Sequence, residues 1–147
     1  MDNKSYQDHY FRRAKEKGYR SRSAFKLIEL NEKFKFFKKG IKLLDVGAYP
    51  GGWCQVANQS VKNGKILGID KKKLIQIKDV KIIEGDFMNE NTKKKILKFF
   101  NSKIDVILSD MAPNTSGNKS LDTIRTNELC FSILEFSQNT LDKNGTV

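Results

Sequence analysis

The sequence predicts one α/β domain, in which helices cover both faces of a mostly parallel, doubly wound sheet. From residue 42 onward, short apolar runs alternate with helical segments, as in chains whose parallel strands are joined by crossover helices. The run at 104–109 is largely apolar, which is typical of a strand that is covered on both faces. A glycine-rich turn at 45–55 follows the first run, and such a turn lets the main chain approach a ligand.

The expected elements follow one another in a regular order. Ser21 and Ser23 offer N-cap oxygens, so we expect a helix that runs from there to about Phe37. Strands are predicted at 42–47, 65–70, 80–84 and 104–109, helices at 53–61, 92–100 and 121–141, and a short irregular or helical piece at 71–78. Asn144-Gly145 is a turn signal that should close the last helix. Thr146-Val147 would then begin a fifth strand.

Length and composition indicate a soluble protein from inside the cell. The 147 residues suffice for a single domain whose core needs no disulfide or metal. Cys54 and Cys130 lack metal-ligand spacing, so we predict no metal site and a reducing compartment. No apolar run approaches the roughly 20 residues of a membrane span, and the N-terminus lacks the apolar region of a signal peptide. We expect a monomer without membrane association.

Positive charge is concentrated at the front of the chain. The formal net charge is +11, and residues 1–42 contain 13 Lys or Arg against 5 Asp or Glu. A basic segment, here about 1–40, ahead of a ligand-binding core indicates a polyanionic partner, most often nucleic acid; the alternative is a solvated, lysine-rich surface. Aromatic rings between the basic residues can stack on unpaired bases, or they can pack an N-terminal helix on the domain. The predicted RNA contacts are Arg12, Arg13, Arg20 and Arg22.

Polar clusters follow each of the first four predicted strands. These clusters are 47–53, Asp70, Gly85-Asp86 and 109–114. In a doubly wound sheet, they should meet at the switch point above the first and fourth strands. An acid at the end of the second strand, here Asp70, can accept hydrogen bonds from ribose hydroxyls, and Asp86 can accept one from an adenine amino group. The sequence therefore predicts a nucleoside-containing ligand at this edge.

The glycine turn favours S-adenosylmethionine over a dinucleotide as this ligand. The turn lacks Gly-x-Gly-x-x-Gly spacing, and Pro50 removes an N–H that a pyrophosphate cradle would use. A ligand with a cationic sulfonium has less need of that cradle and gains more from carboxylates. Asp45, Asp70, Asp86 and Asp110 supply such groups. An oxidoreductase domain of the NAD type is the alternative that this spacing disfavours.

Three segments carry a resemblance to a known family. They are 18–27 (Gly-Tyr-Arg-Ser-Arg-Ser-Ala-Phe-Lys-Leu), 45–55 (Asp-Val-Gly-Ala-Tyr-Pro-Gly-Gly-Trp-Cys-Gln) and 109–114 (Ser-Asp-Met-Ala-Pro-Asn), with Ser116-Gly117. In order and spacing, they resemble the FtsJ/RrmJ family of RNA ribose 2′-O-methyltransferases. The resemblance covers the entire chain and implies a Rossmann-like, S-adenosylmethionine-dependent methyltransferase fold. The third segment resembles that of members modifying a uridine in large-subunit ribosomal RNA, so ribosomal RNA or a precursor of the large subunit is the implied partner.

The resemblance also implies roles for individual residues. Asp70 would bind the ribose of the cofactor, Asp86 its adenine, and Asp110 would lie near the methionine part and the methyl group. The predicted cofactor-binding residues are Gly47, Pro50, Gly51, Gly52, Trp53, Asp70, Asp86 and Asp110. The family's catalytic set is Lys-Asp-Lys-Glu, of which the first two members match Lys26 and Asp110. On helical spacing alone, Lys26 would belong to a solvated charged face.

The other two members of that set are not matched within residues 1–147. The second lysine is expected a few residues into the fifth strand and the glutamate near the family's C-terminus, both beyond Val147. We therefore expect a methyltransferase domain that is C-terminally incomplete, without the closing strands of its sheet. The alternatives are a catalytically inactive RNA-binding or ribosome-assembly factor of the same fold and a family member that acts on tRNA. Cytoplasm, nucleolus, mitochondrion and plastid are all compatible with the sequence.

Overall fold

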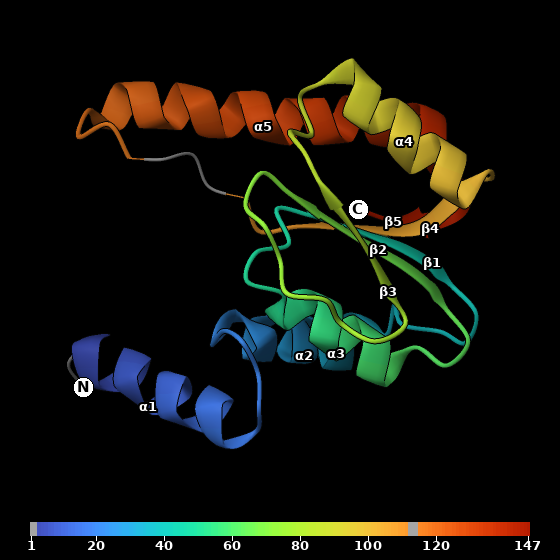
Figure 1. Ribbon diagram of the computed structural model, residues 1–147. Helices are drawn as coiled ribbons and strands as arrows, with labels where there is room; N and C mark the ends of the chain where they lie inside the picture. Colours follow the sequence, from blue (N-terminus) through green and yellow to red (C-terminus); the bar gives the residue numbers. More distant parts are fainter. Residues whose placement is uncertain (1–2, 112–114) are drawn as a thin grey trace.

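Five parallel strands form one sheet in the computed structural model, which describes residues 3–111 and 115–147 (Figure 1). The strands are β1 (Lys42–Val46), β2 (Lys65–Asp70), β3 (Val80–Glu84), β4 (Ile104–Ser109) and β5 (Leu141–Thr146). Their spatial order is β3-β2-β1-β4-β5, and each neighbouring pair is parallel. The strand order reverses between β1 and β4, so the predicted switch point is confirmed.

Helices cover both faces of the sheet, as predicted. They are α1 (Asn3–Glu16), α2 (Ser23–Phe34), α3 (Gly52–Ser60), α4 (Glu90–Phe100) and α5 (Lys119–Thr140). α2 and α3 lie on one face and α4 and α5 on the other, while α1 lies at the periphery (Figure 1). Leu27 and Val56 belong to the apolar cluster on the first face, and Ile96 and Phe136 to the cluster on the second. Within the described residues, none of the helices combines the length and the apolar character that a membrane span requires.

The strand boundaries show how well the local pattern specifies this sheet. β2, β3 and β4 begin and end at the predicted residues.

The start of α5 is set by Asn118, whose Oδ1 accepts hydrogen bonds from the amides of Ser120 at 3.0 Å and Leu121 at 3.3 Å. Such a cap satisfies N–H groups that have no partner within the helix. The carboxyl ends of the strands and the start of α5 therefore lie at fixed positions around one edge of the sheet.

α2 begins at Ser23, close to the predicted start, but its predicted caps and its predicted end are wrong. Ser21 and Ser23 do not act as caps, because their hydroxyls lie 2.8 Å apart and hydrogen-bond each other. The helix ends at Phe34 rather than near Phe37, since Lys35 has a left-handed conformation with φ 51°. Asn31 stabilises this earlier end, because its side-chain oxygen accepts a hydrogen bond from the Phe37 amide at 2.9 Å.

The predicted start of the fifth strand is also wrong. β5 begins at Leu141, directly after α5, and Leu141 pairs with Ile104. Asn144-Gly145 does not close the helix but lies within the strand, where the register shifts before Val106 pairs with Thr146. The Asn144 amide donates to Oδ1 of Asp142 at 3.1 Å. The turn chemistry is therefore used inside an irregular strand, as in a β-bulge.

The aromatic side chains at the front of the chain mainly pack on the domain. Phe25 is buried, and the rings of Tyr10 and Tyr19 lie 5.6 and 5.7 Å from it, centroid to centroid. Phe11, by contrast, is 64% exposed. The packing interpretation is therefore confirmed for Tyr10 and Tyr19, and base stacking stays a prediction for Phe11.

Candidate functional site

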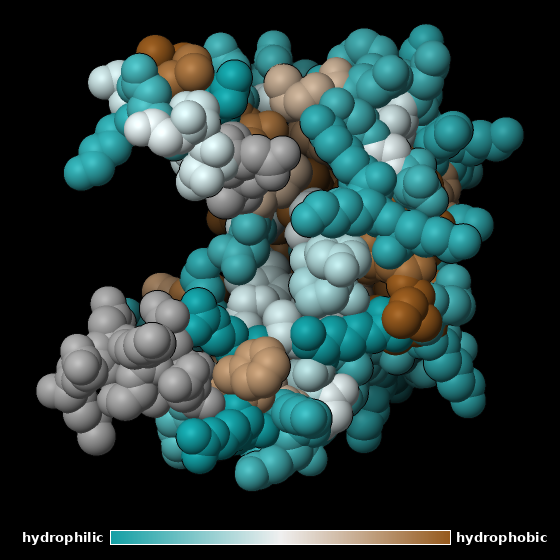
Figure 2. Space-filling model, turned by 60° about the vertical axis from the view of Figure 1, so that its left-hand side comes forward, coloured by the Kyte–Doolittle hydropathy of each residue, from teal (hydrophilic) through white to brown (hydrophobic). Residues whose placement is uncertain are grey.

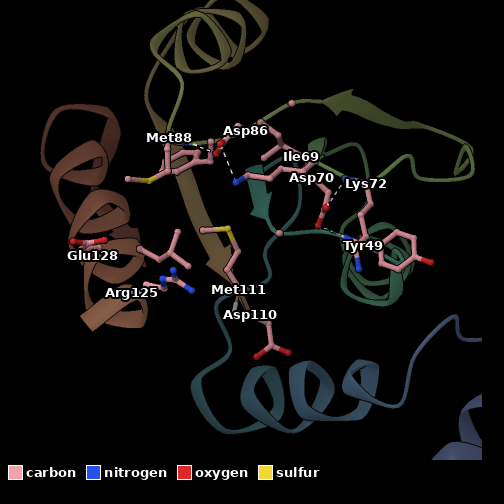
Figure 3. A pocket seen from close by; sticks show the side chains of 15 residues that line it. Tyr49, Ile69, Asp70, Lys72, Asp86, Met88, Asp110, Met111, Arg125 and Glu128 are labelled. Atoms are coloured by element: carbon pink, nitrogen blue, oxygen red, sulfur yellow. Dashed lines mark hydrogen bonds and ion pairs between the residues drawn. The ribbon is translucent and has the colours of Figure 1, made fainter. Parts of the chain in front are cut away.

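A cavity of about 650 Å³ lies at the carboxyl ends of the strands. This volume is within the range of about 300–1,000 Å³ that is usual for small-molecule sites. The lining comes from the segments after β1, β2, β3 and β4 and from one side of α5 (Figure 3). Figure 2 brings this edge of the sheet forward and shows a hollowed region whose surroundings are mostly hydrophilic. The cavity is therefore open to solvent at the predicted switch point.

Gly47 lets the segments after β1 and β4 approach each other. Its φ is +79°, which favours glycine, and a Cβ at this position would lie 2.1 Å from Cγ of Met111. The amides of Gly47 and Ala48 both donate to the carbonyl of Ile69, at 2.9 and 3.0 Å. The turn is thereby fixed over the end of β2, and its main chain lines the cavity.

Asp70 connects two walls of the cavity. Its carboxylate accepts hydrogen bonds from the amides of Tyr49 at 3.0 Å and Lys72 at 2.8 Å. The first amide belongs to the turn after β1 and the second to the loop after β2, and all three residues line the cavity (Figure 3). The predicted ribose-binding acid is therefore held in place by main-chain donors.

Asp86 lines the cavity and is paired with Lys71, a residue that the sequence did not point to. Lys71 Nζ lies 2.9 Å from Oδ2, and the Met88 amide donates to Oδ1 at 2.9 Å. Partial burial raises the pKa of the Asp86 carboxyl, but the hydrogen bonds from Lys71 and Met88 and the lysine charge outweigh it and hold the pKa below its ordinary value. The side chain is therefore a carboxylate at neutral pH and can accept a further hydrogen bond.

Lys26 and Asp110 form an ion pair, although their positions in the sequence differ by 84. Lys26 Nζ lies 2.6 Å from Oδ1 of Asp110, which lines the cavity. The ammonium also lies 5.6 Å from the ring centroid of Trp53, whose indole N–H donates to the Ser23 carbonyl at 2.8 Å. Lys26 therefore does not belong to an unpartnered solvated face, as its spacing alone suggested, but is paired at the rim of the cavity.

Several predicted cofactor residues lie behind the cavity wall. The lining formed by the described residues does not include Pro50, Gly51, Gly52 or Trp53. A Cβ on Gly51 would lie 2.9 Å from Nη1 of Arg20, and one on Gly52 would lie 2.3 Å from Oγ of Ser21. This part of the turn therefore packs against the segment before α2. The part of the predicted 109–114 motif that comprises Ala112, Pro113 and Asn114 lies outside the described residues.

The four predicted RNA contacts divide into two kinds. Arg12, Arg13 and Arg22 are exposed, the first two on α1 and the third directly before α2. The guanidinium of Arg13 lies 4.8 Å from the ring centroid of Phe25. Arg20 is only partly exposed, and its guanidinium bonds main-chain carbonyls. Contact with RNA stays a prediction for all four.

The apolar wall of the cavity was not identified by the sequence analysis. Its members are Ile69, Phe87, Met88, Met111 and Leu129. Arg125 and Glu128 of α5 add charged groups on the same side (Figure 3). Phe87-Met88 directly follows the predicted Gly85-Asp86 cluster, so a local signal existed for these two. The α5 residues carried no such signal, because their position depends on how the helix packs.

Asp45 is buried inside the fold and is not available to a ligand. It is 1% exposed, and the Cys54 thiol donates a hydrogen bond to it at 3.2 Å. Burial raises the pKa of this carboxyl from 3.8 to about 7; the thiol bond lowers the pKa, whereas the charges of Asp110 and Asp70 add to the increase. Asp45 therefore does not contribute a carboxylate to the cavity wall, contrary to its place in the predicted set.

Asp45 should make the stability of the fold depend on pH. The carboxyl keeps its proton up to about pH 7 in the folded state but loses it near pH 3.8 in the unfolded chain. Because the folded state binds more protons between these values, the free energy of unfolding should fall as pH rises through this window and stay level above it. At about 1.4 kcal/mol per pKa unit, the full effect is roughly 4 kcal/mol. Urea unfolding between about pH 5 and pH 8 measures the slope. In Asp45→Asn, the contribution of this carboxyl to the pH dependence of the unfolding free energy should be absent. If the variant shows the same slope as the parent, the pH dependence comes from other groups.

The fold and the cavity define a class of proteins. A parallel sheet with this strand order, a glycine turn after β1 and acids after β2 and β3 is typical of Rossmann-like domains that bind nucleoside-containing cofactors. Within that class, the chain belongs to the FtsJ-like methyltransferase family, whose sequence model matches residues 19–147. The family resemblance and the fold expected from the sequence are both confirmed.

Individual relatives give the same result. The ribosomal RNA large subunit methyltransferase E of Pelagibacter ubique is 46% identical over 143 residues, which are 97% of this chain and 70% of the relative. The protein of the same name from Methanosarcina mazei is 48% identical over 139 residues, which are 94% of this chain and 52% of the relative. This chain thus spans between 52% and 70% of the length of these two curated relatives.

Solved structures agree with the fold. A protein described as a ribosomal RNA methyltransferase, from Plasmodium falciparum, matches with a TM-score of 0.80 and 42% identity, over 86% of this chain and 75% of that one. A short chain dehydrogenase family protein from Francisella tularensis matches with a TM-score of 0.52 at 17% identity. The second likeness concerns the fold alone and shows that the sheet does not determine the chemistry.

Proposed function

We propose that this domain transfers a methyl group from S-adenosylmethionine to a ribose 2′-hydroxyl, that of a uridine in large-subunit ribosomal RNA. The observation that carries the proposal is the ion pair of Lys26 and Asp110 at the rim of a cavity whose other walls hold Asp70 and Asp86. The names of the relatives, ribosomal RNA large subunit methyltransferase E, support the substrate class. Such a substrate implies work in a compartment that assembles ribosomes.

The residues present fit a nucleoside cofactor with a cationic sulfur. Asp70 would accept hydrogen bonds from the ribose hydroxyls, and Asp86 one from the adenine amino group. Phe87 and Met111 offer apolar surface for the ring, and the carboxylate of Asp110 complements a positive charge at the same edge. The cofactor supplies an electrophilic methyl group when it is bound. The absence of a Cβ at Gly47 leaves room for the Met111 side chain beside the turn.

Lys26 and Asp110 would act on the acceptor ribose. The ammonium is held between a carboxylate and an aromatic face, so its position is defined before the RNA arrives. A cation in this place would stabilise the negative charge that develops on the 2′ oxygen as its proton passes to a base. The candidate for that base is the second lysine of the family's set, which residues 1–147 do not match. The pair also orients the hydroxyl relative to the methyl group, which lowers the entropic part of the barrier.

The exposed basic side chains at the front of the chain would bind phosphates. Arg12, Arg13 and Arg22 are exposed, and Phe11, on the same helix as Arg12 and Arg13, offers a ring for base stacking. Each phosphate contact on single-stranded RNA contributes about 0.7 to the slope of log K against log[salt]. RNA affinity should therefore fall steeply as salt is raised.

The proposed function is tested by methyl transfer from tritiated S-adenosylmethionine to large ribosomal subunits that lack the modification. The protein is expressed from the complete reading frame, because the resemblance predicts a second lysine and a glutamate that residues 1–147 do not match. We expect label on one ribose of the large-subunit RNA, located by mapping of the modified nucleotide. Total tRNA is offered in a parallel reaction, and label confined to tRNA would contradict the proposed substrate. RNA binding without any transfer would indicate a non-catalytic factor.

Asp70→Ala provides the matching test of the cofactor pocket. The affinity for S-adenosylmethionine, measured by calorimetry, should fall about 10- to 100-fold, because charge-assisted hydrogen bonds to the ribose are lost. Glu84→Ala is the control, since Glu84 pairs with Asp70 in the strand register and is exposed. If Asp70→Ala binds the cofactor as tightly as the parent, the pocket assignment is wrong.

A further inference from the structure

We propose that Arg20 is a positioning residue that holds two walls of the cofactor pocket together, rather than a contact for RNA phosphates. The inference rests on the proposed function, because it takes the cavity as the S-adenosylmethionine site. It departs from the sequence-based expectation, which grouped Arg20 with Arg12, Arg13 and Arg22 as one basic surface.

The guanidinium of Arg20 donates to three main-chain carbonyls. Nη1 bonds the Ile75 carbonyl at 2.7 Å and the Pro50 carbonyl at 3.4 Å, and Nη2 bonds the Gln76 carbonyl at 3.1 Å. Pro50 belongs to the glycine turn after β1, whereas Ile75 and Gln76 belong to the loop between β2 and β3. One planar group thus connects two segments that are far apart in sequence.

The main chain around Arg20 is anchored as well. Its amide donates to Oε1 of Gln55 at 2.9 Å, and Nε2 of the same glutamine donates to the Gly18 carbonyl at 3.1 Å. Gln55 lies in α3, the helix that follows the glycine turn. The main chain of Arg20 is therefore bonded to α3, and its guanidinium is bonded to the turn after β1 and the loop after β2. The side chain is held against the protein and does not extend into solvent.

The two connected segments form adjacent parts of the pocket wall, where Lys72 Nζ lies 5.0 Å from the ring centroid of Tyr49. The turn contributes Gly47 and Tyr49 to the lining, and the loop after β2 begins with Lys71 and Lys72, which also line it. Any change in the distance between turn and loop alters the space around Asp70, which bonds the amides of Tyr49 and Lys72. The guanidinium bonds lie behind this wall, where they limit its opening.

The chemistry of the contact requires arginine. A guanidinium presents five N–H donors in a rigid plane, so it can serve several carbonyls in fixed directions. A lysine has one compact ammonium and cannot span Pro50, Ile75 and Gln76 with the same geometry. A phosphate that approached Arg20 would compete with these three acceptors, whereas Arg22 is exposed close by in sequence.

The proposal is tested with Arg20→Ala and Arg20→Lys, and with Arg22→Ala as the matched control. Calorimetry with S-adenosylmethionine should show a loss of about tenfold or more for Arg20→Ala, a smaller loss for Arg20→Lys, and parental affinity for Arg22→Ala. Added methylguanidinium should restore binding to Arg20→Ala, because it can occupy the vacated site, whereas methylammonium should not. A residue that served only global stability would not show this rescue.

RNA binding distinguishes the two interpretations of Arg20. The salt dependence of RNA affinity should keep its parental slope in Arg20→Lys and Arg20→Ala, and become shallower by about 0.7 in Arg22→Ala, which loses one phosphate contact. Parental cofactor affinity in Arg20→Ala, or a salt slope reduced by about 0.7 in that variant, would overturn the proposal.

Hydrogen exchange separates failure of this proposal from failure of the proposed function. In Arg20→Lys, the amides of residues 73–77 should exchange faster than in the parent while those of α4 remain unchanged. Unchanged exchange in the loop would refute the positioning role, whatever the ligand is. If the parent itself does not bind S-adenosylmethionine but the loop exchanges faster in the variant, the proposed function fails and the structural role of Arg20 stands.

Discussion

Lys26→Met should lower the rate of methyl transfer by about 10²- to 10⁴-fold, the usual contribution of a positioned group in proton transfer or charge stabilisation. Methionine keeps much of the length and apolar stem of lysine but removes the ammonium that lies 2.6 Å from Asp110. Negative charge on the 2′ oxygen would then develop without the stabilising charge of the Lys26 ammonium. The measurement is single-turnover transfer from tritiated S-adenosylmethionine to large ribosomal subunits, with the protein expressed from the complete reading frame.

Lys33→Met is the matched control for this variant. Lys33 lies on the same helix, is exposed, and has its ammonium over the Phe34 ring rather than at the cavity. Its substitution should leave the rate near that of the parent. Asp110→Asn combined with Lys26→Met should cost little more than the worse single variant, since residues that act as a unit are not additive. Normal transfer by Lys26→Met would return Lys26 to a solvated charged face.

Gly47→Ala should both destabilise the fold and abolish tight cofactor binding. The new Cβ would lie 2.1 Å from Cγ of Met111, and φ is +79°. Left-handed backbone costs a non-glycine residue about 1–2 kcal/mol, and overpacking typically adds about 1–3 kcal/mol. We therefore expect a loss of roughly 2–5 kcal/mol in the free energy of unfolding, measured with urea. Displacement of Met111 into the cavity should lower the affinity for S-adenosylmethionine by about a hundredfold.

Gly40→Ala separates the two contributions. Gly40 also has a positive φ, +76°, but no described atom lies within 4 Å of a Cβ built there. Its substitution should therefore show the conformational cost alone and leave cofactor affinity unchanged. Met111→Ala in the Gly47→Ala background should relieve the overlap and recover part of the stability. Equal destabilisation by Gly47→Ala and Gly40→Ala would show that the close approach of Met111 is unimportant.

The sheet is largely predictable because the first four strands carry their signals locally. β2, β3 and β4 are apolar runs between turns, and their limits depend on neighbours in sequence. The end of α2 and the start of β5 depend on other interactions. Asn31 ends α2 with a side-chain hydrogen bond, and β5 starts at Leu141 because that residue pairs with Ile104. Such contacts are properties of the folded chain and leave no local pattern.

The residues of the site likewise comprise some that the sequence pattern predicts and others that depend on contacts in the folded chain. Asp70 ends β2, and Asp86 and Asp110 follow β3 and β4, so topology alone brings them to one edge of the sheet. The resemblance matched Lys26, whereas its spacing did not distinguish it from a surface lysine. The Lys71 contact with Asp86 and the three carbonyls bonded by Arg20 depend on the path of the loop after β2. A basic residue in the sequence does not reveal whether its charge faces a phosphate or the protein's own main chain.

The central position of β1 has a consequence for the order in which the domain forms. Leu43 pairs with Ile66 on one side, a nearby partner in sequence, and with Val106 on the other, a distant one. Parallel pairing over long stretches of chain is slow, because loop closure costs entropy before the contact is gained. We therefore expect β1 and β2 to associate early and β4 to join later. Lys26 precedes β1 and Asp110 follows β4. The partly folded chain therefore lacks the ion pair that we propose for methyl transfer.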